Sequence, residues 1–297
     1  MISFIRHRKY YFFFSGLLIL VSLGFLITFG LRFGIEFTGG SILEVEYQEY
    51  RPSNDIIRGK LAEFDLGGFL IQPTREKGVI LRLREIDEDT RKQILYKLGQ
   101  VEQKRFESIG PVIGRELRKQ TQTAIILALL SILFYIIFSF RKISRKIKSW
   151  HYGIVSFVAL CHDVLIPLGI LAILGHFHNI EITIPIMIAL LVIFGYSIND
   201  TVVVFDRIRE NLLKQRGMVF EEVVDISINQ TLIRSFNTSF TTLLVLLALF
   251  FFGGITLKYF SLVLIIGIIV GTYSSIFLAA PLLVNWLSWK ERRQKRA

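Results

Sequence analysis

Cysteine is nearly absent from this chain. Its 297 residues include one cysteine, Cys161, so no intrachain disulfide can form and cysteine usage says nothing about the redox compartment. The long polar stretch at residues 32–120 also lacks a His/Cys cluster, a phosphate-binding loop and a nucleophile elbow. We therefore expect a protein without metal, cofactor or covalent catalysis, in which this stretch is a binding or mechanical module.

A continuous basic segment is missing as well, although the formal net charge is +11. Residues 32–119 are nearly neutral, with 16 Lys and Arg against 15 Asp and Glu. Most of the excess positive charge lies in three short flanks beside apolar runs, at residues 6–9, 141–148 and 290–296. Such flanks set membrane topology and favour anionic lipid headgroups. We therefore expect a lipid bilayer, and no nucleic acid, as a partner.

Apolar residues dominate the rest of the chain. Hydrophobic residues make up 52% of it, 26 residues are Phe, and the mean hydropathy is +0.52, which soluble proteins rarely reach. Runs of about 20 residues, long enough to cross a bilayer, occur six times. They span residues 10–31, 121–140, 152–174, 182–205, 233–255 and 259–283. We predict a polytopic α-helical membrane protein with six transmembrane helices.

The first run follows basic residues, as in a signal peptide, but it is too long for one and no A-x-A-like cleavage site follows. We interpret it as an uncleaved helix with its N-terminus in the cytoplasm. All three basic flanks are then cytoplasmic, and the polar stretch is external. The predicted divisions are 1–31 (N-terminus and first helix), 32–120 (external domain), 121–283 (bundle, with cytoplasmic loops 141–151 and 206–232) and 284–297 (basic cytoplasmic tail).

The external stretch contains two periodicities. Period-two patterns predict strands, and amphipathic patterns that begin at Ser53 and Asp87 predict helices. The order is strand 41–47, helix 53–64, strands 68–72 and 79–83, helix 87–98 and strand 101–109. This β-α-β-β-α-β order is that of the ferredoxin-like α+β fold, for which about 90 residues suffice.

Asp200 interrupts the fourth apolar run, which continues beyond it. A carboxyl near the middle of a membrane helix costs roughly 2.5–3.5 kcal/mol on insertion scales, so Asp200 is a functional candidate. In the predicted topology Arg234, at the head of the fifth run, shares its depth and can pair with it. A moving Arg234 would then switch the affinity of the carboxyl for a proton, which is the minimum for a proton-coupled motion. The alternative is that Asp200 lies at a helix end in the membrane interface.

Polar neighbours extend this hypothetical proton pathway. Thr238 shares a helical face with Arg234, and Asn199 is next to Asp200. Side chains of these types can hold ordered water between helices, whereas the alternative is that they only support helix packing.

Asp163, beside His162 in the third run, is a weaker proton-pathway candidate, because a lone Asp in a membrane helix can also be a buried structural partner. The sixth run has small residues at spacings of four, which favours close helix packing. These residues are Gly267, Gly271 and Ser275.

Several strings then resemble the motifs of a known family. They are Gly195–Asn211 (GYSINDTVVVFDRIREN), Gln230–Ser239 (QTLIRSFNTS), Gly271–Phe277 (GTYSSIF), Gly34–Gly40 (GIEFTGG) and the pair His162-Asp163. They are similar to those of the SecF family, accessory subunits of the bacterial Sec protein-export machinery, and the likeness runs along nearly the whole chain. The family commonly has Asp where Glu36 stands here, a difference that keeps the charge.

The resemblance implies an RND-like transporter half that pairs with a SecD-like subunit and acts with the SecYEG channel, with YajC and YidC as further partners. It implies a bacterial cytoplasmic (inner) membrane location, an unfolded preprotein as client and the proton-motive force as energy source. The family's proton-pathway Asp and its nearby Arg match Asp200 and Arg234.

Two alternatives to this function remain at the level of sequence. Half of an RND-type small-molecule or lipid exporter would need larger external domains than the ~90 residues present here. A non-transporting assembly scaffold would use the polar helix faces for packing alone.

Overall fold

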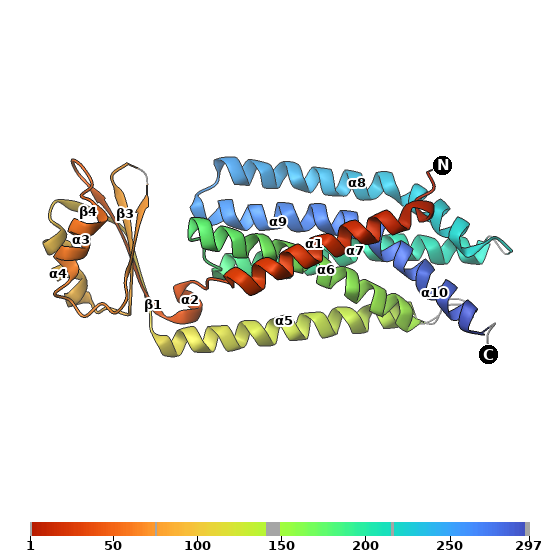
Figure 1. Ribbon diagram of the computed structural model, residues 1–297, viewed down its shortest axis with the longest axis horizontal. Coiled ribbons are helices and arrows are strands. Elements are labelled where there is room, and N and C mark those ends of the chain that lie inside the picture. The colour runs from red at the N-terminus through yellow and green to blue at the C-terminus, as the bar shows by residue number, and fades with distance from the viewer. Residues whose placement is uncertain (1, 75, 141–148, 215–216, 295–297) are drawn as a thin grey trace. The chain divides into compact units, whose positions relative to one another are not determined.

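The computed structural model describes residues 2–74, 76–140, 149–214 and 217–294, which form long helices and one small sheet (Figure 1). The chain divides into two compact units. The helical unit comprises Met1–Arg32 and Ala124–Ala297, and the sheet unit comprises Phe33–Thr123. Each unit has a hydrophobic core of its own, as expected of separate domains.

Within the described ranges, six helices are long and apolar enough to cross a membrane, which confirms the polytopic α-helical class. They are α1 (Arg8–Phe29), α5 (Pro111–Ser139), α6 (Ser149–His178), α7 (Ile184–Lys214), α8 (Phe220–Phe252) and α9 (Ile255–Ser274). A π-helical turn, η2 (Ser275–Ala279), and α10 (Ala280–Gln294) continue α9, and a 3-10 turn, η1 (Ile5–His7), precedes α1.

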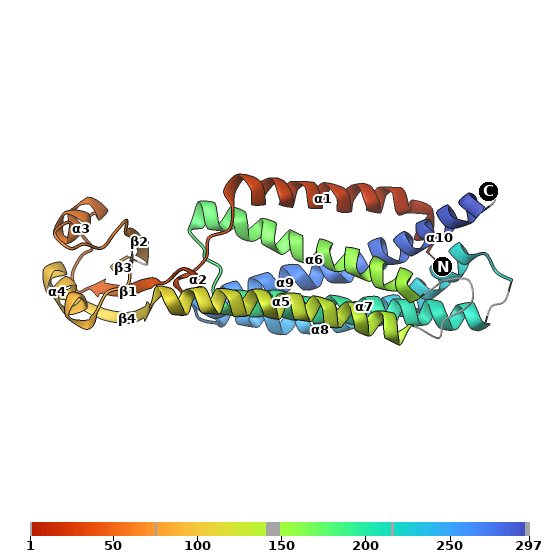
Figure 2. The ribbon, with the colours of Figure 1, turned by 90° about the horizontal axis from the view of Figure 1, so that it is seen from below.

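The bundle has inner and outer helices. At least 50% of the most apolar stretch is buried in the spans of α6, α7 and α9. The buried share is at most 17% in the spans of α1, α5 and α8. Accordingly, α9 lies between α6 and α8 in Figures 1 and 2. A Cβ added to Gly267 of α9 would lie 2.2 Å from Cδ1 of Ile193 on α7, so a larger residue would force the Ile193 side chain to move. Polar groups on the buried faces of the inner helices are thus screened from lipid.

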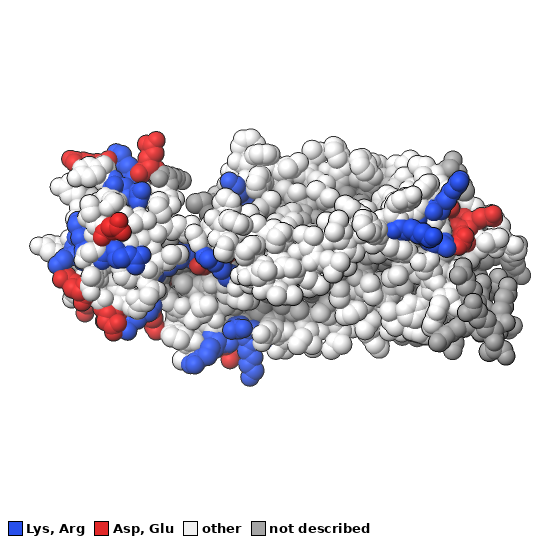
Figure 3. Space-filling view, in the orientation of Figure 1, with Lys and Arg blue, Asp and Glu red and all other residues white. Residues whose placement is uncertain are grey.

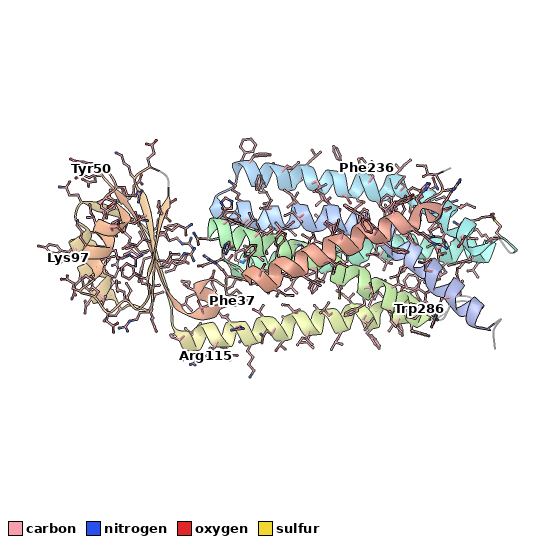
Figure 4. All side chains as sticks on the ribbon, viewed as in Figure 1. Phe37, Tyr50, Lys97, Arg115, Phe236 and Trp286 are labelled. Carbon is pink, nitrogen blue, oxygen red and sulfur yellow. The ribbon has the colours of Figure 1, made fainter. Side chains whose placement is uncertain are left out.

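The outer surface of the helical unit suits a bilayer. On the face shown in Figure 3, charged side chains gather toward the ends of this unit and the surface between them is uncharged. Large apolar side chains cover the outer helices, as Phe236 does on α8, where it is 63% exposed (Figure 4). Such a belt is stable only against lipid or another membrane-spanning chain.

The sheet unit has the predicted ferredoxin-like order. Its elements are the one-turn helix α2 (Ile35–Thr38), β1 (Gly40–Tyr47), α3 (Asn54–Leu61), β2 (Leu70–Thr74), β3 (Gly78–Leu83), α4 (Glu88–Leu98) and β4 (Val101–Ile109). The strands pair antiparallel in the order β2-β3-β1-β4. Alternate residues such as Leu43 and Leu81 face the core, together with Ile57 of α3 and Ile94 of α4. The caps are those expected, since Ser53 and Asp87 accept from backbone N–H groups at the starts of α3 and α4.

Several helices are longer than their apolar runs. The stretch at 206–232, predicted to be a loop, is helical apart from residues 217–219 among those described, because α7 continues to Lys214 and α8 begins at Phe220. Charge pairs one turn apart stabilise the end of α7: Arg207–Glu210 at 2.8 Å and Glu210–Lys214 at 2.6 Å. A search for apolar runs cannot detect this extension, because the α-helix continues after the apolar residues have ended.

Two further segments differ from the predicted divisions in the same way. Within the predicted loop 206–232, Val223 and Val224 at the start of α8 are fully buried. The tail expected from 284 begins inside α10, where Val284 and Leu287 are buried. The basic flank at 141–148 and the side chains of the flank at 290–296 lie outside the described part of the chain.

Candidate functional site

Asp163 lies at the centre of the helical unit and is fully buried with His162 beside it on α6. Its Oδ2 atom accepts from Ser197 Oγ of α7 at 2.5 Å and from Ser274 Oγ of α9 at 2.6 Å. Its Oδ1 atom lies 2.8 Å from Nδ1 of His162. Three inner helices therefore meet at one carboxylate, whose burial is offset by three hydrogen bonds.

Close packing of α9 makes this meeting possible. Gly271 of α9 lies one turn before Ser274 and Ser275, and a Cβ added there would be 3.2 Å from Cβ of Ser197 and 3.6 Å from Oδ2 of Asp163. Ser275 bonds in turn to Thr201 of α7, with 2.9 Å between the hydroxyl oxygens. The small residues predicted for helix packing thus lie where α9 and η2 contact α7, and Gly271 borders the carboxylate.

Asp200 lies almost one turn further along α7 than Ser197 and is 3% exposed. Thr272 of α9 donates to its Oδ2 atom over 3.4 Å, and the same hydroxyl lies 2.6 Å from Ser239 Oγ of α8. Tyr196 donates to Ser239 over 3.4 Å. A second polar layer therefore joins α7, α8 and α9, but it holds Asp200 less tightly than the first layer holds Asp163.

The two layers are connected through α9. Thr272 and Ser274 are two residues apart, which places their side chains on opposite sides of a helix, so one element bonds to both carboxylates. The π-turn η2 follows directly at Ser275. Turns of this kind are frequent at functional sites because they loosen the regular hydrogen-bond ladder.

The expected pairing of Asp200 with Arg234 is not a direct ion pair in this structure. Among the described residues no ion pair joins them, and Arg234 is exposed on α8. Ser235 and Ser239 face the bundle, and consecutive helical residues diverge by 100°, so Arg234 points to another side. It lines an open cavity of about 420 Å³ between α5, α7 and α8. The other lining residues are Ser139, Phe140, Val202, Val203, Asp206, Arg207, Glu210, Gln230 and Thr231.

The remaining proton-pathway candidates lie at the edge of this arrangement. Asn199 is exposed on α7, and Thr238 is exposed one turn after Arg234, where its hydroxyl donates to the Arg234 carbonyl over 2.7 Å. The sequence reasoning missed Ser197 and Ser274 as partners of Asp163. In sequence, each of these serines is marked only by lying within one helical turn of a polar motif residue. Hydroxyl residues in such positions are common in membrane helices, so this feature does not identify a partner.

A metal site has no support in the described residues, since no group of three or more His, Cys, Asp or Glu side chains lies close enough together to hold an ion. The ligands that this site offers are hydroxyls, two carboxylates and one imidazole, all of which can transfer or orient protons.

Comparisons with known proteins agree with the motifs. Residues 90–289 match the family model of the protein export membrane protein SecD/SecF, C-terminal, and residues 24–49 match the SecD/SecF GG motif. The protein translocase subunit SecF of Thermobaculum terrenum is 44% identical, over 96% of this chain and 94% of that protein. The SecF of Haemophilus influenzae is 38% identical, over 93% of this chain and 83% of that protein.

A solved structure shows the same arrangement. The crystal structure of SecDF, a translocon-associated membrane protein from Thermus thermophilus, is 35% identical with a TM-score of 0.82, over 96% of this chain. The match spans 38% of the SecDF chain. A second SecDF structure, in the super-membrane-facing form, has a TM-score of 0.70 at 34% identity. With six membrane helices, a ferredoxin-like unit and these matches along almost its whole length, the chain belongs to the SecD/SecF family of protein export membrane proteins.

Proposed function

We propose that the chain is a SecF-type subunit of the Sec preprotein translocation machinery and that it uses the proton-motive force to help export unfolded preproteins. The observation that carries this proposal is the pair of carboxylates, Asp163 and Asp200, buried among hydroxyls of the inner helices. A carboxylate in such a place costs insertion energy and is retained where its charge has a use. Protonation of Asp200 removes one negative charge from the bundle and turns one carboxyl oxygen into a hydrogen-bond donor toward the surrounding hydroxyls.

Arg234 has its proposed role in a different state of the assembly. Within the apolar span of α8 its side chain is exposed, as are those of Asn237 and Thr238. Polar groups in a membrane helix face protein or water rather than lipid, so we infer that a partner chain covers this face. A SecD-like subunit is the proposed partner, because the SecDF chain that this chain resembles is more than twice as long. Arg234 would then approach Asp200 when the two halves move.

The wider setting is proposed on the same basis. The chain would lie in the bacterial cytoplasmic membrane with both termini in the cytoplasm and residues 32–120 outside, where the sheet unit would meet the emerging preprotein. SecYEG would be the channel that it assists, with YajC and YidC as further partners. The basic flanks support this orientation through the positive-inside rule.

The test replaces Asp200 by Asn and measures preprotein export into inverted membrane vesicles with and without a proton gradient. We expect D200N to lose the gradient-dependent increase in export and to keep the gradient-independent part, because Asn is isosteric but binds no proton. D206N is the matched control, since Asp206 lies on the same helix but pairs with Arg209 at its exposed end, 3.3 Å away.

Full gradient-dependent export by D200N would contradict the proposed role of Asp200. Altered drug susceptibility with unchanged export would instead favour a small-molecule exporter.

A further inference from the structure

The hydrogen-bonding capacity of Asp163 is largely used inside the protein. Oδ2 accepts from Ser197 and Ser274, and Oδ1 shares a hydrogen with Nδ1 of His162. A new proton on Oδ2 would have to displace one of the two hydroxyl donors, each within 2.6 Å. The carboxylate is therefore held in place, Oδ2 is a poor point for a proton to arrive, and Oδ1 already shares a hydrogen with the imidazole.

His162 has the open position. Its side chain is fully buried, and within the described part of the chain its Nε2 atom has no hydrogen-bond partner. When Nδ1 carries the hydrogen that it shares with Asp163, Nε2 has a bare lone pair directed away from the carboxylate. A buried nitrogen without a partner is costly unless it exchanges a proton or a water molecule during function.

We propose that the Asp163 site takes up its proton at Nε2 of His162 and that Asp163 is the positioning residue that orients the ring. The inference rests on the proposed proton coupling and adds a second proton-binding residue to it. One proton joins Nε2 and no other bond changes. The hydrogen between Nδ1 and Oδ1 can lie nearer to either atom, and in both arrangements the new proton is on Nε2. The pair of side chains changes from one negative charge to zero.

The surroundings of the imidazole suit this change. Consecutive residues of α6 diverge by 100°, so Asp163 faces α7 and α9 while His162 faces another side, toward Tyr273. The Tyr273 ring stacks on the imidazole, with the two ring centroids 6.3 Å apart and the planes inclined by 29°. The phenol of Tyr273 is directed away, since it donates to the carbonyl of Tyr11 on α1 over 3.3 Å.

Few other titratable groups of the described residues face the imidazole. On its own helix it meets Asp163, and Cys161 precedes it in sequence. From α9 it meets Tyr273, and from α1 the nearest titratable neighbour of that ring is Tyr11. The buried carboxyl group of α7, Asp200, bonds to Thr272 in the other polar layer. A change of charge at Nε2 therefore acts electrostatically mainly on Asp163 and on the contact between α1 and α9.

The test is solid-state NMR of the full chain in lipid bilayers, with ¹⁵N in histidine and ¹³C in aspartate side chains, over a pH series. At high pH we expect His162 to show a protonated Nδ1 and a bare Nε2. As the pH falls, the bare Nε2 signal should be lost and an Nε2–H signal should appear, while the hydroxyl-bound carboxylate keeps its place. His176 and His178, exposed in the last turn of α6, supply the reference signals of solvent-facing imidazoles.

Assignment uses H162Q and D163N and, should either fail to fold, sequential correlations through residues 161–163 of the wild-type chain. A His162 ring that keeps a hydrogen on Nε2 at every pH would overturn the proposal. So would unchanged His162 nitrogens together with a titrating Asp163 carboxyl carbon. The measurement needs neither a preprotein nor a partner chain, so its failure is distinguishable from a failure of D200N in the export assay.

Discussion

At the scale of single residues, the two buried carboxylates differ in how firmly they are held. Asp163 has three partners within 2.8 Å, whereas Asp200 has one hydroxyl at 3.4 Å. Hydrogen bonds weaken steeply with length, so Asp200 keeps capacity for a water molecule or for Arg234. The loosely held carboxylate is the one that a moving arginine can engage, and the firmly held one instead fixes the meeting point of three helices.

Replacing Ser274 by Ala tests this distinction. The variant loses one donor to Asp163 while Ser197 remains, and we expect a loss of about 1 kcal/mol in the free energy of unfolding. The control is S261A on the same helix, since Ser261 is equally buried but donates only to the carbonyl of Leu257. Reversible unfolding in mixed micelles measures both. Equal stability of S274A and S261A would show that the α9 hydroxyl does not support the carboxylate.

At the scale of elements, the position of α1 depends on how closely it approaches α6. Gly169 of α6 faces Ser22 of α1, and an added Cβ would lie 2.6 Å from its Cβ and 2.7 Å from its Cα. A clash with a backbone atom cannot be relieved by a rotamer change, so the helix itself must shift. Because α1 carries the aromatic residues that pack on Tyr273, such a shift would reach the imidazole side of the polar site.

We therefore expect G169A to lower the free energy of unfolding by about 1–3 kcal/mol, as overpacking in a core does. G16A is the matched control, because a Cβ on Gly16 of α1 would meet nothing within 4 Å. It should change stability by no more than about 0.5 kcal/mol. Thermal unfolding of the two variants in the same lipid gives the comparison. A neutral G169A would mean that α1 is not seated firmly on α6.

At the scale of the whole molecule, the sequence predicts most of the architecture. Apolar runs identify six membrane helices because the bilayer sets a minimum length, and alternating patterns identify the sheet unit. The extension of α7 through residues 206–214 was not predicted, because charge pairs rather than a repeating pattern of apolar residues stabilise it.

The site was predictable only in part. Asp200 stands out in sequence because its neighbours are apolar, but the direction of Arg234 around α8 depends on how that helix is rotated by its packing. The partners of Asp163 lie 34 and 111 residues away in sequence, and no local pattern links them. Only the close approach of α9 at Gly271 brings these residues together.

The sheet unit has the core and the caps of a domain that folds alone, and its response to acid can be predicted from α4. Hydrogen bonds from Thr90 hold the pKa of Asp87 below its ordinary value, and Arg91 does the same for the pKa of Glu88. Both groups therefore bind protons more weakly when folded than when unfolded. Their contribution to stability is present above the ordinary carboxyl pKa of about 4 and is lost as the pH falls through the lowered folded value.

Comparing the two helix caps of the sheet unit separates the effect of protonating a cap from the effect of losing one, because Asp87 titrates and Ser53 does not. In residues 33–123 expressed alone, D87N should flatten the fall in unfolding free energy between about pH 5 and 2, because the amide does not titrate. S53A should lower stability by about 1 kcal/mol at every pH, since the Ser53 hydroxyl caps α3 without titrating. Urea unfolding over a pH series measures both. If stability falls as steeply with acid in D87N as in the wild type, the responsible titrating groups lie elsewhere in the sheet unit. The comparison therefore tests whether the acid sensitivity of the sheet unit arises in α4.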